Sequence, residues 1–168
     1  MRVLGIDPGT VIMGYGVVES HNDDLNMIDC GALATSERSP IGERLCYLYQ
    51  KLLCIMENFR PDMVAVEQPF VASNVRSALA IGRAQAVALL AAATQSIPTQ
   101  EYTPAQIKQS VANYGASSKA QVQEMVRLQL GLKEVPHPDD AADALAVAIC
   151  HLREAHLSEL LARQEEKR

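Results

Sequence analysis

The sequence predicts an α/β fold, a mixed five-stranded sheet with helices on both faces. Three short-looped strands at the start of the chain favour antiparallel pairing. Two later strands each follow a helix, which favours parallel pairing through right-handed crossovers. A length of 168 residues with 48% hydrophobic residues is enough for one domain with a real core. We therefore expect a single globular unit built around this sheet.

The predicted elements follow from hydrophobic periodicity and turn residues. Each predicted strand is a short, apolar or alternating run, and these runs cover residues 2–7, 14–20, 25–34, 63–67 and 97–102. The predicted helices have apolar residues three and four apart or recognisable start signals, and they cover residues 41–56, 75–94, 104–113, 119–131 and 140–161. The run 63–67 is nearly all apolar, as expected of a strand that is buried on both faces.

Helix starts are marked by capping residues. Thr103 and Gln106 form a capping box with proline between them, and Ser118 and Gln121 have the same spacing. We expect Asp139 to cap the last helix, with Asp140 as its first residue.

Charge is distributed unevenly along the chain. The net charge is −5, but residues 68–133 hold six basic and two acidic residues, a net +4, so the remainder carries −9. A basic middle within an acidic chain suits local contact with a polyanion such as a nucleic acid.

Composition also excludes several classes. No apolar run reaches the 18 or so residues of a membrane span, and no secretory signal is recognisable, so we expect a cytoplasmic protein. The four cysteines lack zinc-knuckle spacing and are expected to be small, buried hydrophobes. We expect one domain over residues 1–157 and a charged, frayed tail over 158–168.

Four acidic residues stand out because of their positions. Asp7 and Glu67 end two predicted strands, where sites form in open α/β sheets. Asp140 and Asp143 are three apart in the last helix and share one of its faces. Singly, an aspartate before Pro-Gly is usually a turn former, and one at a helix start is usually a cap. Converging carboxylates would repel one another, so together they indicate a site for hard divalent cations.

Several motifs in order resemble the RuvC family of Holliday junction resolvases. The resemblance covers about residues 1–152 and rests on Gly5-Ile6-Asp7-Pro8-Gly9, Gly14-Tyr15-Gly16, Val66-Glu67-Gln68-Pro69-Phe70 and the stretch from Asp140 to Ala146. It implies an RNase H-like fold, a homodimer, and symmetric Mg²⁺-dependent nicking of four-way DNA junctions in recombination and repair. The branch-migration proteins RuvA and RuvB are its implied partners.

The resemblance also implies roles for individual residues. The four acids, Asp7, Glu67, Asp140 and Asp143, correspond to the ligands of two Mg²⁺ ions, for which Mn²⁺ can substitute. Two-metal phosphodiester hydrolysis is then the implied mechanism. Lys108 and Lys119 match DNA-contacting lysines, and Lys119 also assists at the phosphate. Phe70 matches an aromatic residue that stacks on bases. Arg76 is predicted to contact DNA, with a solvated helix position as the alternative.

Other readings stay open on sequence alone. A related RNase H-like nuclease that acts on RNA is the nearest rival, and a non-catalytic junction-binding module is another. The Asp7-Pro8-Gly9-Thr10 loop also resembles the phosphate loop of actin-like and Hsp70-like ATPases, although 168 residues leave no room for their second domain. Within the last motif, the pair of Asp139 and Asp143 is an alternative to that of Asp140 and Asp143.

Overall fold

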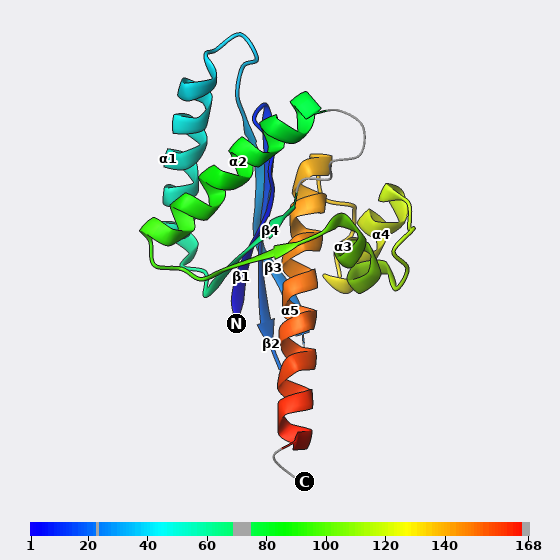
Figure 1. Ribbon diagram of the computed structural model, residues 1–168. Coiled ribbons are helices and arrows are strands. Elements are labelled where there is room, and N and C mark those ends of the chain that lie inside the picture. The colour runs from blue at the N-terminus through cyan, green and yellow to red at the C-terminus, as the bar shows by residue number, and fades with distance from the viewer. Residues whose placement is uncertain (23, 69–74, 166–168) are drawn as a thin grey trace.

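The fold is a mixed five-stranded sheet in the order β3-β2-β1-β4-β5 (Figure 1). It is seen in a computed structural model that describes residues 1–22, 24–68 and 75–165, apart from the side chains of residues 75–77 and 165. The strands are β1 (Arg2–Asp7), β2 (Ile12–His21), β3 (Asp24–Ala34), β4 (Met63–Glu67) and β5 (Thr99–Tyr102). The first three pair antiparallel, whereas β4 pairs parallel with both β1 and β5. The predicted topology is confirmed.

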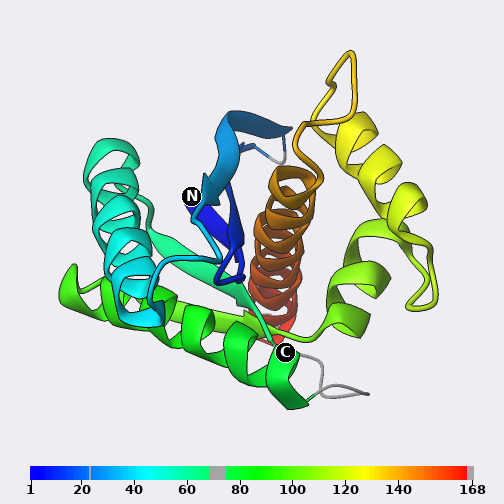
Figure 2. The same ribbon diagram turned by 90° about the horizontal axis from the view of Figure 1, so that it is seen from above.

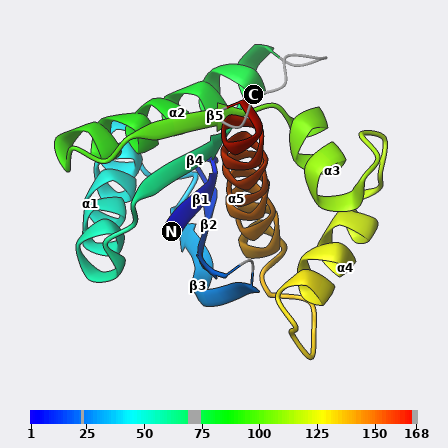
Figure 3. The same cartoon turned by 90° about the horizontal axis from the view of Figure 1, so that it is seen from below.

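Helices cover both faces of the sheet, as predicted. They are α1 (Ile41–Phe59), α2 (Val75–Thr94), α3 (Pro104–Ala112), α4 (Lys119–Gln129) and α5 (Asp139–Glu165). Seen from above, α1 and α2 lie on one side of the strands and α5 on the other (Figure 2). The pair α3 and α4 packs against α5 on its outer side (Figure 3).

The core is divided into two layers by the alternation of side chains along the strands. In β1, Val3 belongs to the cluster under α5, whereas Leu4 and Ile6 belong to the cluster under α1 and α2. In β4, Ala65 faces α5 while its neighbours on either side face α1 and α2. Because successive side chains point to opposite faces, this alternation also decides where the strand-end acids point.

Helix α5 continues further than the sequence predicts. It runs to Glu165 rather than Leu161, so most of the expected charged tail is helical. Figure 1 shows its last turns projecting beyond the sheet. Three leucines in the C-terminal part of the helix, Leu157, Leu160 and Leu161, are exposed. Among the described residues, no helix combines the length and apolar character that crossing a membrane requires.

The expectation for the cysteines is wrong in part. Cys150 is buried in the core cluster under α5, as expected of a small hydrophobe. Cys46 and Cys54 are both exposed. They are eight residues apart on α1, so they lie on one face of that helix, and the structure turns that face to solvent.

Candidate active site

Two acids stand next to each other at the ends of adjacent parallel strands. The register of β1 and β4 pairs Ile6 with Val66, so Asp7 and Glu67 follow side by side. Both belong to the series of residues that faces α5, two positions after Gly5 and Ala65 respectively. Both side chains are half-buried. The structure thus brings these two carboxylates together at the strand ends, as the sequence predicts.

The first turn of α5 lies against the same strand ends. A Cβ atom on Gly14 would lie 2.0 Å from the Asp140 carbonyl oxygen, and one on Gly5 would lie 2.1 Å from the Ala144 carbonyl oxygen. Only glycine permits this backbone contact. The two glycines therefore let α5 approach β1 and β2 closely enough to place Asp140 and Asp143 beside Asp7.

The prediction that Asp139 caps α5 is wrong. The helix already includes Asp139, and the Ala141 N–H donates to the Pro138 carbonyl oxygen at 2.9 Å, which closes the first turn one residue earlier than expected. Proline before or at a helix start is compatible with this geometry. The Asp139 side chain is exposed and lies near Lys119, with its Oδ2 3.8 Å from Nζ.

Two lysines complete the cluster from the outer helices. The predicted capping boxes are both present, Thr103 with Gln106 at α3 and Ser118 with Gln121 at α4. They fix the start of α4 so that Lys119 is its first residue, and its Nζ lies 2.6 Å from Asp143 Oδ2. Lys108, in α3, supplies the second cation.

These side chains line one pocket of about 310 Å³. Its charged lining consists of Asp7, Glu67, Asp143, Lys108 and Lys119. Its apolar walls come from Pro104, Ile107, Val122 and Ala146. Hydrophobic periodicity predicts Ile107 and Val122 only as core residues, because their position at the pocket depends on how α3 and α4 pack over α5.

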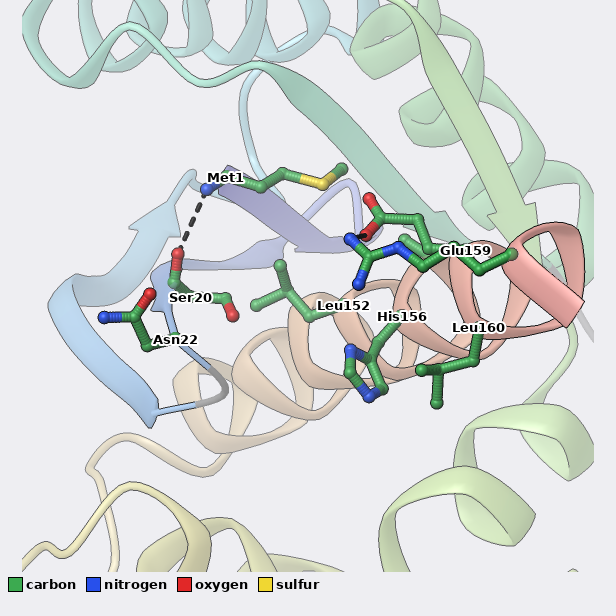
Figure 4. Close-up of a pocket in the computed structure, with 9 residues that line it drawn as sticks. Met1, Ser20, Asn22, Leu152, His156, Glu159 and Leu160 are labelled. Atoms are coloured by element: carbon green, nitrogen blue, oxygen red, sulfur yellow. Dashed lines mark hydrogen bonds and ion pairs between the residues drawn. The ribbon is translucent and has the colours of Figure 1, made fainter. Parts of the chain in front are cut away.

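A second pocket of about 380 Å³ lies at the other end of the sheet (Figure 4). It is lined by Ser20 at the end of β2, by Asn22 just after that strand, and by the C-terminal half of α5, including His156. Glu159 is the one acid among the described residues that line it, and Arg163 Nη2 lies 3.8 Å from Glu159 Oε2. The second pocket therefore lacks the convergent carboxylates that distinguish the first.

Burial and mutual repulsion raise the pKa values of the strand-end acids. The pKa of Asp7 is raised to about 6, first by burial and then by the charges of Asp143 and Asp140. The pKa of Glu67 is raised to about 7 by burial and by Asp7 and Asp143, against the lowering effect of Lys108 and Lys119. Perturbed carboxylates gathered in a pocket are typical of catalytic sites and cation sites.

Lys119 compensates part of this negative charge. Burial raises the pKa of Asp143, although the hydrogen bond and charge of Lys119 lower it. The same hydrogen bond raises the pKa of Lys119 and keeps it protonated. The ammonium groups of Lys108 and Lys119 thus face four carboxylates, so acidic groups outnumber basic ones in the cluster.

The donor set suits a hard cation. Carboxylate oxygens are the ligands that Mg²⁺, Mn²⁺ and Ca²⁺ prefer, and their unrelieved repulsion favours binding of positive charge. Within the described part of the chain, no three acidic, histidine or cysteine side chains are already closed into a metal-binding group. The ammonium of Lys119 instead lies beside Asp143, and an added metal cation would compete with it for that carboxylate.

Two predicted DNA-contacting residues are not placed by the structure. Phe70 lies outside the described residues, and so does the side chain of Arg76, whose backbone forms part of the first turn of α2. The residues that sequence reasoning missed are Thr10, Thr35 and Arg44, which surround the turn after Asp7. No local pattern signals them, because Arg44 lies 34 residues from Thr10 along the chain.

The sheet order, the helix across the antiparallel strands and the strand-end acids define an RNase H-like fold with a nuclease-type acidic site. A family model described as crossover junction endodeoxyribonuclease RuvC matches residues 3–151. The chain belongs to the RuvC family.

Curated relatives and solved structures agree with this assignment. RuvC of Dehalococcoides mccartyi is 58% identical over 90% of both chains, and that of Chloroflexus aurantiacus is 57% identical over 90% of this chain and 92% of its own. Thermus thermophilus RuvC, solved in complex with a Holliday junction substrate, has a TM-score of 0.85 and 36% identity over 94% of this chain and 96% of its own. The yeast mitochondrial Holliday junction resolvase Ydc2, at 17% identity and a TM-score of 0.68 over 99% of this chain and 86% of its own, shares the fold.

Proposed function

We propose that this protein resolves four-way DNA junctions by paired, symmetric nicks in recombination and repair. The observation that carries the proposal is the pocket that gathers Asp7, Glu67 and Asp143 with Lys108 and Lys119 in a RuvC-family chain. Acids suit cations that act on a phosphodiester, and lysines suit the phosphate backbone.

The proposed metal is Mg²⁺, two ions per site, with Mn²⁺ as a substitute. Asp7, Glu67, Asp140 and Asp143 are the residues that would hold it. When bound, the metal would supply an activated water and stabilise the leaving oxygen. The acids keep the site negative until cations arrive, and Lys119 would then be free to exchange Asp143 for a substrate phosphate. Lys108 would bind the backbone nearby, and Phe70 and Arg76 remain proposed DNA contacts.

A homodimer would present two such sites to two strands of one junction. Helix α2 supports this proposal because Leu79 and Leu90 are 57% and 59% exposed on it. A Cβ atom on Gly82 would meet no atom within 4 Å, which leaves the middle of the helix open to a neighbour. RuvA and RuvB are proposed as further partners, and the cytoplasm as the location.

The test compares four labelled substrates: a synthetic four-way junction, a linear duplex of the same arms, an RNA hairpin and an RNA–DNA hybrid. Each is incubated with the protein in Mg²⁺ and in chelator. We expect paired nicks in the junction alone, and only with Mg²⁺. Preferential cutting of RNA or of the hybrid would favour the RNA-directed alternative. Tight junction binding without any cleavage would favour the non-catalytic module.

A further inference from the structure

The turn that follows Asp7 is tightly built. Residues 8–11 connect the last residue of β1 to the first residue of β2, and the ladder pairs Asp7 with Gly14. A Cβ atom on Gly9 would lie 1.9 Å from the Ile12 carbonyl oxygen, so the turn has no room for a side chain there. Thr10 at its tip is only 7% exposed.

A side chain from α1 holds this turn from outside. Arg44 Nε donates to the Thr10 carbonyl oxygen at 2.9 Å, and Nη2 donates to Thr10 Oγ1 at 2.8 Å. The Arg44 Nε–H also lies 3.2 Å from Thr35 Oγ1. Two nitrogens of one planar guanidinium thus hold both polar oxygens of a single buried threonine, a forked contact that lysine cannot reproduce.

Thr35 forms a second contact with the same turn. Its Oγ1 donates to the Thr10 carbonyl oxygen at 2.7 Å, and its backbone N–H donates to the Val11 carbonyl oxygen at 2.8 Å. These bonds satisfy the carbonyl oxygens of the turn without any contribution from Arg44. Without the guanidinium, the carbonyl oxygens of the turn keep these bonds, whereas the buried Thr10 hydroxyl loses its bond from Arg44.

The turn connects to both halves of the acidic site. Asp7 precedes it directly, and Gly14, two residues into β2, lies against the Asp140 carbonyl oxygen on the face of the sheet that α5 covers. A shift of the turn would move the Asp7 carboxylate and would also change the seat of the first turn of α5. An anchor on Thr10 is therefore in a position to fix the spacing between Asp7 and Asp140.

We propose that Arg44 is a positioning residue for the acidic site: through Thr10 it fixes the turn between β1 and β2, and so holds Asp7 at the spacing that divalent metal binding and cleavage require. The expected effect on cleavage rests on the proposed function. The expected effect on metal binding requires only that the acids bind a divalent cation. Residues that support metal ligands in this way typically contribute tenfold to hundredfold in metal affinity or activity.

The experiment uses Arg44→Met, which keeps a long apolar stem but removes the fork. Metal binding is followed without DNA, as the rise in melting temperature over a Mn²⁺ titration. We expect the Mn²⁺ concentration for half of the full rise to increase about tenfold or more. Junction cleavage should lose a comparable factor in kcat, with KM within about twofold of wild type because no DNA contact is removed.

Two further variants separate positioning from general stability. Arg38→Met removes an exposed cation from the connection between β3 and α1, six residues before Arg44, and should match wild type in both assays. Arg44→Lys keeps the positive charge but lacks the forked guanidinium, and it should recover only part of the response to Mn²⁺. If Arg44→Met does not fold, this variant alone tests the positioning role. A purely structural role would lower the melting temperature equally with and without Mn²⁺.

Specific outcomes would overturn the proposal. One is an unchanged Mn²⁺ midpoint in Arg44→Met together with wild-type kcat. Another is full recovery of both by Arg44→Lys, which would reduce the role to charge. A wild-type protein that responds to Mn²⁺ but cleaves no junction would contradict the proposed function instead, while the Mn²⁺ midpoint would still decide the role of Arg44.

Discussion

Lys119 Nζ lies 2.6 Å from Asp143 Oδ2, so the first residue of α4 forms an ion pair with an acid in the first turns of α5. The lysine is 55% exposed, whereas the Asp143 side chain is only 22% exposed. The pair therefore joins a solvent-facing cation to a half-buried anion at the rim of the pocket. It neutralises one acid in the metal-free protein and leaves the lysine within reach of a substrate phosphate.

Removing either lysine should weaken the handling of DNA. Lys108→Ala and Lys119→Ala should each reduce junction affinity or turnover and lower the slope of log Kd against log salt by about one counterion, because each would lose one phosphate contact. Gel-shift titrations between 50 and 200 mM salt measure the slope. Lys51→Ala, on the far helix α1, is the control. Equal slopes in all variants would show that both lysines are ordinary surface charges.

The strand-end acids should be needed for cleavage but not for binding. Asp7→Asn and Glu67→Gln should abolish nicking of a four-way junction, since each removes a proposed metal ligand. Junction affinity in chelator should be retained or improved, because the acids repel phosphate when no metal is bound. Gel shift and cleavage assays on the same preparations test this. Parallel loss of both would contradict the assignment.

Metal-free stability should depend on pH through Glu67. Its pKa is raised from 4.5 to about 7 in the folded state, so the folded protein binds the proton more tightly than the unfolded chain. Stability from this group is therefore present below about pH 4.5 and is lost as the pH rises through about 7. Glu67→Gln should increase the free energy of unfolding by about 3 kcal/mol at pH 8 and by only about 1 kcal/mol at pH 5.

Urea unfolding in chelator at these two pH values measures the difference. Glu57→Gln, an exposed glutamate of α1, is the matched control and should change little at either pH. A gain that is the same at both pH values would mean that the effect comes from packing rather than from ionisation.

The structure at the start of α5 predicts that Asp140 matters more for cleavage than its neighbour Asp139. Asp140 is half-buried and its charge raises the pKa of Asp7, whereas Asp139 is exposed and its Oδ2 lies 3.8 Å from Lys119 Nζ. Asp140→Asn should therefore lose most junction cleavage at unchanged melting temperature, while Asp139→Asn should remain close to wild type. Cleavage rates in saturating Mg²⁺ check the order, and the reverse order would transfer the ligand to Asp139.

Phe70 is predicted to stack on DNA bases. Phe70→Ala should weaken junction binding or processing by about 1–3 kcal/mol, the usual contribution of one stacked base. A core phenylalanine would instead cost about 3–5 kcal/mol of stability on truncation. Comparing junction affinity with the melting temperature separates the two roles, and a large fall in melting temperature would assign Phe70 to the core.

Local patterns were sufficient for much of the fold. The apolar run 63–67 predicts β4 with its observed bounds, because a strand buried on both faces needs no polar alternation. The capping boxes at Thr103 and Ser118 predict where α3 and α4 begin, because side chain and backbone satisfy each other within four residues. The antiparallel pairing of the first three strands and the parallel pairing of the later two followed from short loops and crossover rules.

The remainder depends on contacts that are distant along the chain. The predicted start of α5 was one residue too late. The Ala141 N–H donates to the Pro138 carbonyl oxygen, so the first turn includes Asp139, which was expected to precede the helix as its cap. The acids themselves could be found because they interrupt apolar runs. Arg44 could not, since an arginine in an amphipathic helix is usually solvated, and only the packed turn reveals its partner.

The close contact of α5 with β1 and β2 has a consequence for synthesis of the protein. Asp7 is made before Asp140 and Asp143, which follow it by more than 130 residues along the chain. Until α5 has been translated, Val3 and Val18 lack the helix that covers them, and the acid cluster lacks two of its members. A nascent chain that ends before α5 therefore lacks both the cover of this part of the core and two of the four acids that we propose as metal ligands.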